Sequence, residues 1–570
     1  MSNVNSQRSF FGFLVAGAMA LLIVAIAGFY WFVAKTPVDL MASTSRPNAA
    51  IFVSKLAPAM VSLLTNPEQL QSLGLKEQLS QLKSSLLANS IIDYKQDIKP
   101  WLGNEITLSV TTLDIDRDPK NGQQPGYLMV LAADKPAKSR EFLDLFFSQR
   151  VLAGANLAVE QYQGVKLISD NSNFQLQQNS LTGAVVHGFV LFANHPQVLR
   201  DAINNVQAPD LNLPSSPQYQ KALQQISPAS LATAFFNLPA LAQWQGLKLP
   251  PATFHSQIIS LSLNPRGLLA ETNFFTDWEI MPPSAPLAQP VGALEYIPDG
   301  AGVIIASSDL NNLDNSDLGQ LWTQVKTVFS GSGTDGISSL VAPLRELQKN
   351  QGINLKEDIF SWVKGEYALA LLPHGESTYP DWVFVVEKLK DVPEGISHLD
   401  TIASFRELNL SSFNLNQQKV SAWTKLTAVI EPTNTKQPPT FAIDTKVQGV
   451  HTTLGNYEIF ASKLETLAEI ITNYQSTVMA DKEALRSPRV AEVRNPNFLD
   501  SIVAIPQPNQ GYIYIDWTKS KTMLESQVPI LQLVEIVGKP FLQNLRSLTI
   551  SSYGNEEKSL KGKVLFQFLD

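Results

Sequence analysis

Residues 97–105 read DIKPWLGNE, and residues 358–366 read DIFSWVKGE. Both stretches carry aspartate, tryptophan and glutamate at the same three positions, and both run into an apolar segment typical of a β-strand. The six shared residues are Asp97, Trp101, Glu105, Asp358, Trp362 and Glu366. A repeated segment of this kind indicates that two related halves follow one another along the chain.

The repeated stretch has two interpretations. Read as a functional motif, two acidic pairs beside an aromatic ring could bind a cation or a polar ligand. Read as a structural motif, each aspartate caps a one-turn helix by accepting backbone N–H groups, and each tryptophan fills the core. Gly103 and Gly365 suit the ends of such turns. We favour the structural interpretation, because it accounts for nearly every residue.

Further matches extend the repeat toward the end of each half. Phe192-Ala193 corresponds to Phe460-Ala461, and a helical pattern follows each pair. Residues 258–263 and 268–275 are expected to form two strands of a hairpin, turned by the intervening Asn264-Pro265-Arg266-Gly267. Because helices and neighbouring strands are mixed in both halves, the pattern predicts an α+β fold with mainly antiparallel sheets.

A proline-rich segment separates the two halves, since residues 281–291 contain four prolines. The predicted fold class is one N-terminal transmembrane helix followed by two tandem, duplicated α+β domains. We assign residues 1–9 to a cytoplasmic tail, 10–34 to a transmembrane anchor, 35–46 to a tether, 47–280 to the first repeat, 281–291 to a linker and 292–570 to the second repeat.

The anchor is predicted from residues 10–34, which read FFGFLVAGAMALLIVAIAGFYWFVA and carry no charge. A helix of about 25 residues is roughly 37 Å long, which is enough to cross a hydrocarbon layer of ~30 Å. Aromatic residues at both ends fit the two membrane interfaces. Cleavage as a signal peptide after a small-x-small site is the alternative. We expect a single-pass membrane protein whose large domain is periplasmic or thylakoid-lumenal.

Composition narrows the classes of partner and chemistry. The net charge of −8 repels nucleic acid phosphates, so we expect no nucleic acid partner. The chain has no cysteine, which excludes disulfides, thiolate nucleophiles and cysteine-ligated zinc. No cofactor is expected.

The candidates for metal binding and catalysis are few. Asp114, Asp116 and Asp118 begin like a calcium loop, but prolines occupy the sixth and twelfth positions, where glycine and glutamate are needed. The three carboxylates are therefore weak metal candidates. No G-x-S-x-G motif is present. The histidines show no metal-binding spacing. They are His187, His195, His255, His374, His398 and His451.

The anchor, the tether, the duplicated region and the two Asp-x-x-x-Trp-x-x-x-Glu segments together resemble a cyanobacterial family of membrane-anchored proteins of unknown function. The resemblance covers essentially the whole chain and implies a location in the envelope or thylakoid membrane. It supplies no catalytic residues.

We therefore expect a non-enzymatic, membrane-tethered binding or scaffold protein, held to the membrane by one span and bound to a protein partner. Two alternatives from other classes stay open. One is an envelope hydrolase whose site lies between the two halves. The other is a carrier of lipid or pigment, which needs a continuous apolar cavity of roughly several hundred Å³.

Overall fold

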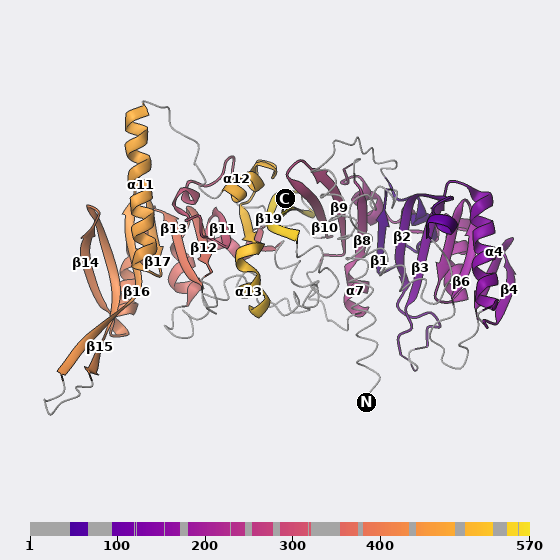
Figure 1. Cartoon of the computed structure of the whole chain (residues 1–570), viewed down its shortest axis with the longest axis horizontal. Helices are drawn as coiled ribbons and strands as arrows, with labels where there is room; N and C mark the ends of the chain where they lie inside the picture. The colour runs from indigo at the N-terminus through magenta and orange to yellow at the C-terminus, as the bar shows by residue number, and fades with distance from the viewer. Residues whose placement is uncertain are drawn as a thin grey trace.

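The structure is a computed structural model, shown in Figure 1. It describes residues 46–65, 94–170 apart from 119, 121 and 153, 181–244 apart from 228 and 229, 254–277, 286–320 apart from 317, 354–373, 380–431, 440–484, 496–527, 544–556 and 558–569. We call residues 46–277 the first half and residues 286–569 the second half. The molecule is elongated, with the two halves at opposite ends (Figure 1).

The described residues form a single antiparallel sheet of 20 strands. The first half contributes β1 (Ala59–Leu63), β2 (Leu102–Thr112), β3 (Gly126–Ala133), β4 (Leu157–Tyr162), β5 (Val165–Asp170), β6 (Thr182–Val186), β7 (Phe189–Ala193), β8 (Ala232–Asn237), β9 (Ser256–Asn264) and β10 (Gly267–Phe275). The second half contributes β11 (Val303–Ser308), β12 (Glu366–Leu372), β13 (Asp381–Glu387), β14 (Asn409–Leu415), β15 (Gln418–Glu431), β16 (Thr440–Leu454), β17 (Tyr457–Ala461), β18 (Tyr512–Asp516), β19 (Leu545–Glu556) and β20 (Ser559–Phe568).

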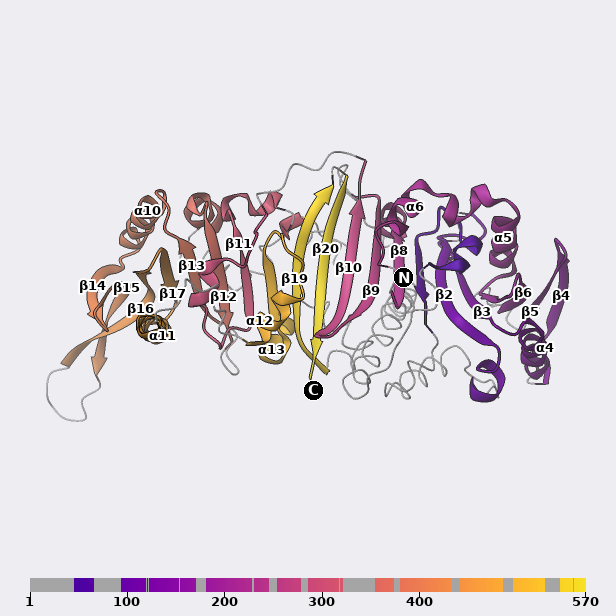
Figure 2. The ribbon, with the colours of Figure 1, turned by 90° about the horizontal axis from the view of Figure 1, so that it is seen from above.

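Both halves pair their strands in the same order. The first half runs β4-β5-β6-β7-β3-β2-β1-β8-β9-β10 from the outer edge inwards. The second half continues as β20-β19-β18-β11-β12-β13-β17-β16-β15-β14. Strands β10 and β20 pair with each other and form a seam between the halves, from Leu268 opposite Phe566 to Phe275 opposite Ser559. Figure 2 shows β10 and β20 side by side at the centre.

Helices and short turns pack on the two faces of the sheet. The helices are α4 (Pro136–Leu152), α5 (Pro196–Gln207), α6 (Pro217–Leu223), α7 (Leu238–Trp244), α10 (Val392–Phe405), α11 (Leu464–Ala484), α12 (Pro496–Val503) and α13 (Trp517–Gln527). The short turns used below are η1 (Asn48–Phe52), η2 (Tyr94–Ile98), η5 (Gly292–Tyr296) and η9 (Leu355–Ile359). Because both faces are covered, inner strands such as β12 and β18 are apolar almost throughout rather than alternating.

Helix α5 illustrates how the local sequence sets an element. Pro196 lies in its first turn, where the missing N–H of proline costs nothing, and the His195 side chain caps the helix by accepting from the Gln197 N–H. Val198 and Ala202 lie four residues apart, on the face that is buried against the sheet. The helix is therefore specified by both its cap and its apolar face.

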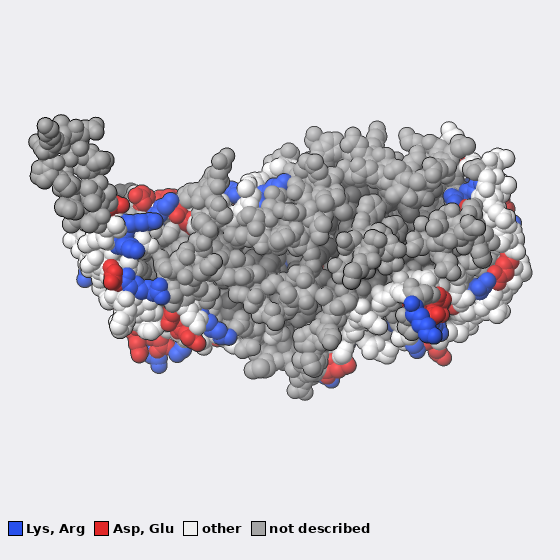
Figure 3. Space-filling model, turned by 90° about the horizontal axis from the view of Figure 1, so that it is seen from below, with Lys and Arg blue, Asp and Glu red and all other residues white. Residues whose placement is uncertain are grey.

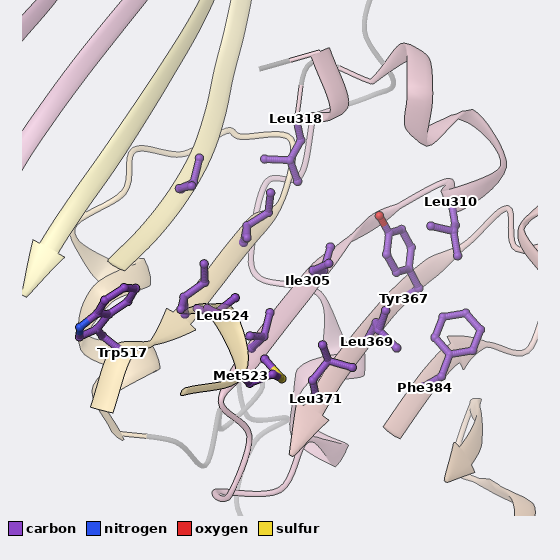
Figure 4. Packing of buried hydrophobic residues seen from close by; sticks show 14 of the residues in the cluster. Ile305, Leu310, Leu318, Tyr367, Leu369, Leu371, Phe384, Trp517, Met523 and Leu524 are labelled. Carbon is purple, nitrogen blue, oxygen red and sulfur yellow. The ribbon is translucent and has the colours of Figure 1, made fainter. Parts of the chain in front are cut away.

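One hydrophobic core crosses the seam. It contains Leu268 and Phe274 from β10 together with Leu560 and Phe568 from β20. The same core continues into the second half, where Figure 4 shows Tyr367, Leu369 and Phe384 on neighbouring strands, with Met523 and Leu524 of α13 packed against it. Shared packing and shared strand pairing together hold the two halves as one body.

The predicted fold class is wrong. The sequence indicated two tandem α+β domains behind a transmembrane helix, whereas the described strands belong to one continuous antiparallel sheet. Among the described residues, no helix is long and apolar enough to cross a membrane. The apolar segment of residues 10–34 lies outside the described residues. The physical reason for the error is that alternation reveals which segments are strands but not that the last strand of each half pairs with the other.

Candidate functional site

The repeated tryptophans make the same contact in both halves. The indole Nε1–H of Trp101 donates to the Asp97 carbonyl oxygen at 2.7 Å, and that of Trp362 donates to the Asp358 carbonyl oxygen at 2.7 Å. Both rings are buried in the hydrophobic core. Each indole therefore joins the turn η2 or η9 to the core, as the structural interpretation of the motif requires.

The aspartates are placed differently from the prediction. In η9 the residue that caps the turn is Asn354, whose side chain accepts from the Lys356 N–H at 3.2 Å. Asp358 lies inside the same turn, and its carboxylate accepts from the Asn354 N–H at 2.7 Å and contacts His398 Nε2 at 2.9 Å. The carboxylate of Asp358 thus fastens the turn from within rather than capping its start.

The repeated glutamates connect the core strands to the first turn of each half. Glu105 accepts from the backbone N–H groups of Asn48 and Ala49 at 3.0 and 2.9 Å. Glu366 accepts from the Gly292 N–H at 2.7 Å. Burial raises the pKa of Glu105, while these hydrogen bonds oppose the shift. In both halves the glutamate holds η1 or η5 against the sheet, which is a structural role.

The three weak metal candidates lie near one another in one loop. Partial burial and the neighbouring Asp116 carboxylate raise the pKa of Asp114. Asp116 accepts from the Asp118 N–H at 3.0 Å, which is an ordinary turn contact within an acidic loop. Within the part of the chain that the structure describes, no group of three or more histidine, aspartate or glutamate side chains is arranged to hold a metal ion.

A buried histidine forms a polar cluster that the sequence did not reveal. His451 Nδ1 lies 2.7 Å from Glu458 Oε1, and Thr453 Oγ1 donates to Glu458 Oε2 at 2.6 Å. The imidazole stacks on Trp423 and Phe460, with ring centroids 5.1 and 5.4 Å apart. The feature from which this cluster could have been found is the β16–β17 hairpin. Its register puts Thr453 opposite Glu458 and His451 opposite Phe460, all on one face of the sheet.

A row of polar residues crosses the centre of the sheet. Each member is the register partner of the next, across seven strands. The members are Thr107, Ser62, Thr233, Ser260, Glu271, Lys563 and Ser551. Glu271 and Lys563 form an ion pair at 2.5 Å at the seam, and Ser62 shares a hydrogen bond with Thr107 at 2.7 Å. The row supports the observed strand register, since a slip would separate the Glu271–Lys563 ion pair and the Ser62–Thr107 hydrogen bond.

Exposed apolar side chains gather at the two ends of the sheet. At one end, which we call the α4 end, they are Leu145, Val151, Leu152 and Val159. At the other end, which we call the β14 end, they are Phe405, Leu410, Phe413 and Leu426. Leu152 is 88% exposed and Phe405 is 85% exposed. Seen from below, charges of both signs are interspersed at each end rather than gathered into a patch of one sign (Figure 3).

Comparison with known proteins gives one family and little else. No curated protein matches the chain. A solved structure titled "Structure of crystal form I of TP0453" aligns with a TM-score of 0.25 and 9% sequence identity, covering 41% of this chain and 80% of that chain. Residues 14–568 match DUF3352, described as a protein of unknown function. This match confirms the expected membership in a family of unknown function: the chain belongs to DUF3352.

Proposed function

We propose that this chain is a non-catalytic, membrane-tethered scaffold that binds a protein partner through the α4 end. The observation that carries the proposal is the exposed apolar surface at the end of a single extended sheet. A helix of a soluble protein normally turns its apolar residues inwards, and α4 does so with Phe142, Phe146 and Phe147. It also exposes Leu152, and Val159 of the edge strand β4 is exposed as well. Large apolar side chains that stay exposed at one end of a sheet support a protein interface there.

Rigidity across the seam supports a scaffolding role. The β10–β20 ladder and the core that crosses it join the halves by backbone hydrogen bonds and by packing. A partner bound at the α4 end is therefore held at a fixed distance from the β14 end. A hinged pair of domains would not transmit that constraint.

Attachment to a membrane, with the sheet on the periplasmic or lumenal side, is part of the proposal. The uncharged segment of residues 10–34 supports it, and the family match begins within that segment, at residue 14. The net charge of −8 supports a protein partner rather than nucleic acid. The cyanobacterial source implied by the resemblance stays a prediction.

We also propose that the two halves arose by internal duplication. The shared Asp-Trp-Glu stretch, the equal order of strand pairings and the equal tryptophan contacts support this origin. If the two ends of a duplicated unit later took different roles, their exposed apolar residues would differ in kind and position, as they do.

The test is recovery of a partner from solubilised membranes by the full-length chain. The diagnostic variant is Leu152→Glu combined with Val159→Lys, which places charges on the α4 end without touching the core. Leu56→Glu is the matched control, because Leu56 is 71% exposed and lies away from the α4 end. We expect the same protein to be recovered by wild type and control and lost by the diagnostic variant. Equal recovery by all three would overturn the proposal, as would hydrolytic activity in a chain that recovers nothing.

A further inference from the structure

Strand β14 is an edge strand without the usual protection. Among the described strands it pairs only with β15, and six of its seven residues are exposed. Its sequence, NLSSFNL, contains no charged residue and no proline. Natural edge strands are normally protected by lysine, proline or a covering element. The opposite edge, β4, carries Glu160, which is paired with Arg200 at 2.6 Å.

The outward-facing backbone groups of β14 can be assigned from its hairpin. Leu415 pairs with Gln418 across the two-residue loop Asn416-Gln417, whose φ angles are 47° and 63°. The residues that flank such a loop form a hydrogen-bonded pair, and hydrogen-bonded pairs then alternate along the ladder. The N–H and C=O groups of odd-numbered residues therefore point toward β15. Those of Leu410, Ser412 and Asn414 point outwards.

The outward N–H and C=O groups of β14 can pair with the same groups of β14 in a second copy of the chain. A two-fold axis perpendicular to the sheet at Ser412 pairs Ser412 with Ser412 of a second copy. The same axis pairs Leu410 with Asn414 of that copy and Asn414 with Leu410. Each pair exchanges two backbone hydrogen bonds, which gives six across the interface. The exposed Phe413 then lies diagonal to Phe413 of the second copy, within reach of an aromatic contact.

We propose that β14 pairs antiparallel with β14 of a second copy of this chain and forms a two-fold dimer. The occupant is a second copy because the register centred on Ser412 uses every outward group of the strand and brings no like charges together. The two halves of the chain are joined by the same kind of pairing. β10 is the last strand of the first half, β20 is the last strand of the second half, and the two pair antiparallel. Figures 1 and 2 both place β14 near one end of the long axis of the molecule. Self-pairing goes beyond the proposed function and leaves the α4 end of each copy free for a partner.

The first experiment measures the mass of the purified full-length chain, in detergent and without partner, across a range of concentrations. Ser412→Pro removes an outward N–H that the intramolecular ladder does not use, so the monomer is expected to fold. Gln161→Pro is the matched control, because the same hairpin analysis makes Gln161 an outward residue of β4. We expect dimers for wild type and Gln161→Pro and loss of the dimer for Ser412→Pro.

The second experiment uses the absence of cysteine from the chain. In the proposed register Ser412 faces itself, with Cα atoms about 5.5 Å apart, which fits a disulfide. Ser412→Cys should therefore form a covalent dimer on mild oxidation, whereas Leu410→Cys, which faces Asn414, should not. A monomer at all concentrations would overturn the proposal. A dimer that survives Ser412→Pro without cross-linking through Ser412→Cys would overturn it equally. Neither result bears on partner binding at the α4 end.

Discussion

Glu271 and Lys563 hold the same position in the two halves and form an ion pair with each other. Each is the fifth residue of the strand that follows the last hairpin turn of its half. They are register partners at the centre of the seam, with Lys563 Nζ 2.5 Å from Glu271 Oε1 and both side chains mostly buried. Two identical residues would face each other here if the halves were identical, and like charges would repel. Opposite charges turn this position into an attraction that aligns the two strands.

The stability of the junction should be sensitive to the charges of the seam ion pair. Glu271→Lys is expected to destabilise the fold by roughly 3–5 kcal/mol, because it leaves Lys563 buried beside a like charge. Adding Lys563→Glu restores opposite charges and should recover most of that loss. The measurement is the free energy of unfolding of the wild type and the two variants by chemical denaturation. A double variant no more stable than Glu271→Lys would show that the pair does not act through its charges.

The two repeated tryptophans should respond alike to the same substitution. Trp101→Phe and Trp362→Phe keep an aromatic ring in the core but remove the Nε1–H that donates to the carbonyl oxygen four residues earlier. Each is expected to cost about 0.5–1.5 kcal/mol for the lost hydrogen bond, plus a contribution from the smaller ring. Thermal unfolding of both variants checks the prediction. A loss of stability in only one of the two variants would mean that the two repeated stretches do not contribute equally to stability.

The sequence predicted local features better than their assembly. The hairpin at Asn264-Pro265-Arg266-Gly267 is confirmed by the pairing of Asn264 with Gly267, because turn residues act locally. The burial of Trp101 and Trp362 also follows from their apolar surroundings. The β10–β20 seam could not be predicted, since it joins segments almost 300 residues apart and the apolar pattern of a strand does not name its partner. The contact of His451 with Glu458 depends on hairpin register, which scattered histidines do not reveal.

Glu105 should make the stability of the fold depend on pH. Burial raises its pKa above the usual value of 4.5, so the folded state holds the proton more tightly than the unfolded state. Its contribution to stability is therefore present below the unfolded pKa and is lost as the pH rises through the folded pKa. The difference in unfolding free energy between wild type and Glu105→Gln should change in that direction as the pH rises above 4.5. Glu394→Gln, on the exposed face of α10, is the control and should show no such change.

His451 and Glu458 should behave as one coupled unit. His451→Phe keeps the stacking on Trp423 and Phe460 but leaves the buried Glu458 carboxylate without its Nδ1 partner. Glu458→Leu leaves the imidazole unpaired in the same way. Each single change is expected to lower the free energy of unfolding by about 1–3 kcal/mol, because it leaves a buried polar group without a hydrogen-bond partner.

The double variant His451→Phe with Glu458→Leu removes both polar groups at once. We expect it to cost less than the sum of the single changes, with a coupling of about 0.5–3 kcal/mol from the double-mutant cycle. Unfolding free energies of the four proteins at one pH give that coupling directly. Strictly additive losses would mean that the 2.7 Å contact contributes nothing beyond the packing of each side chain. The imidazole would then be held by its aromatic neighbours alone.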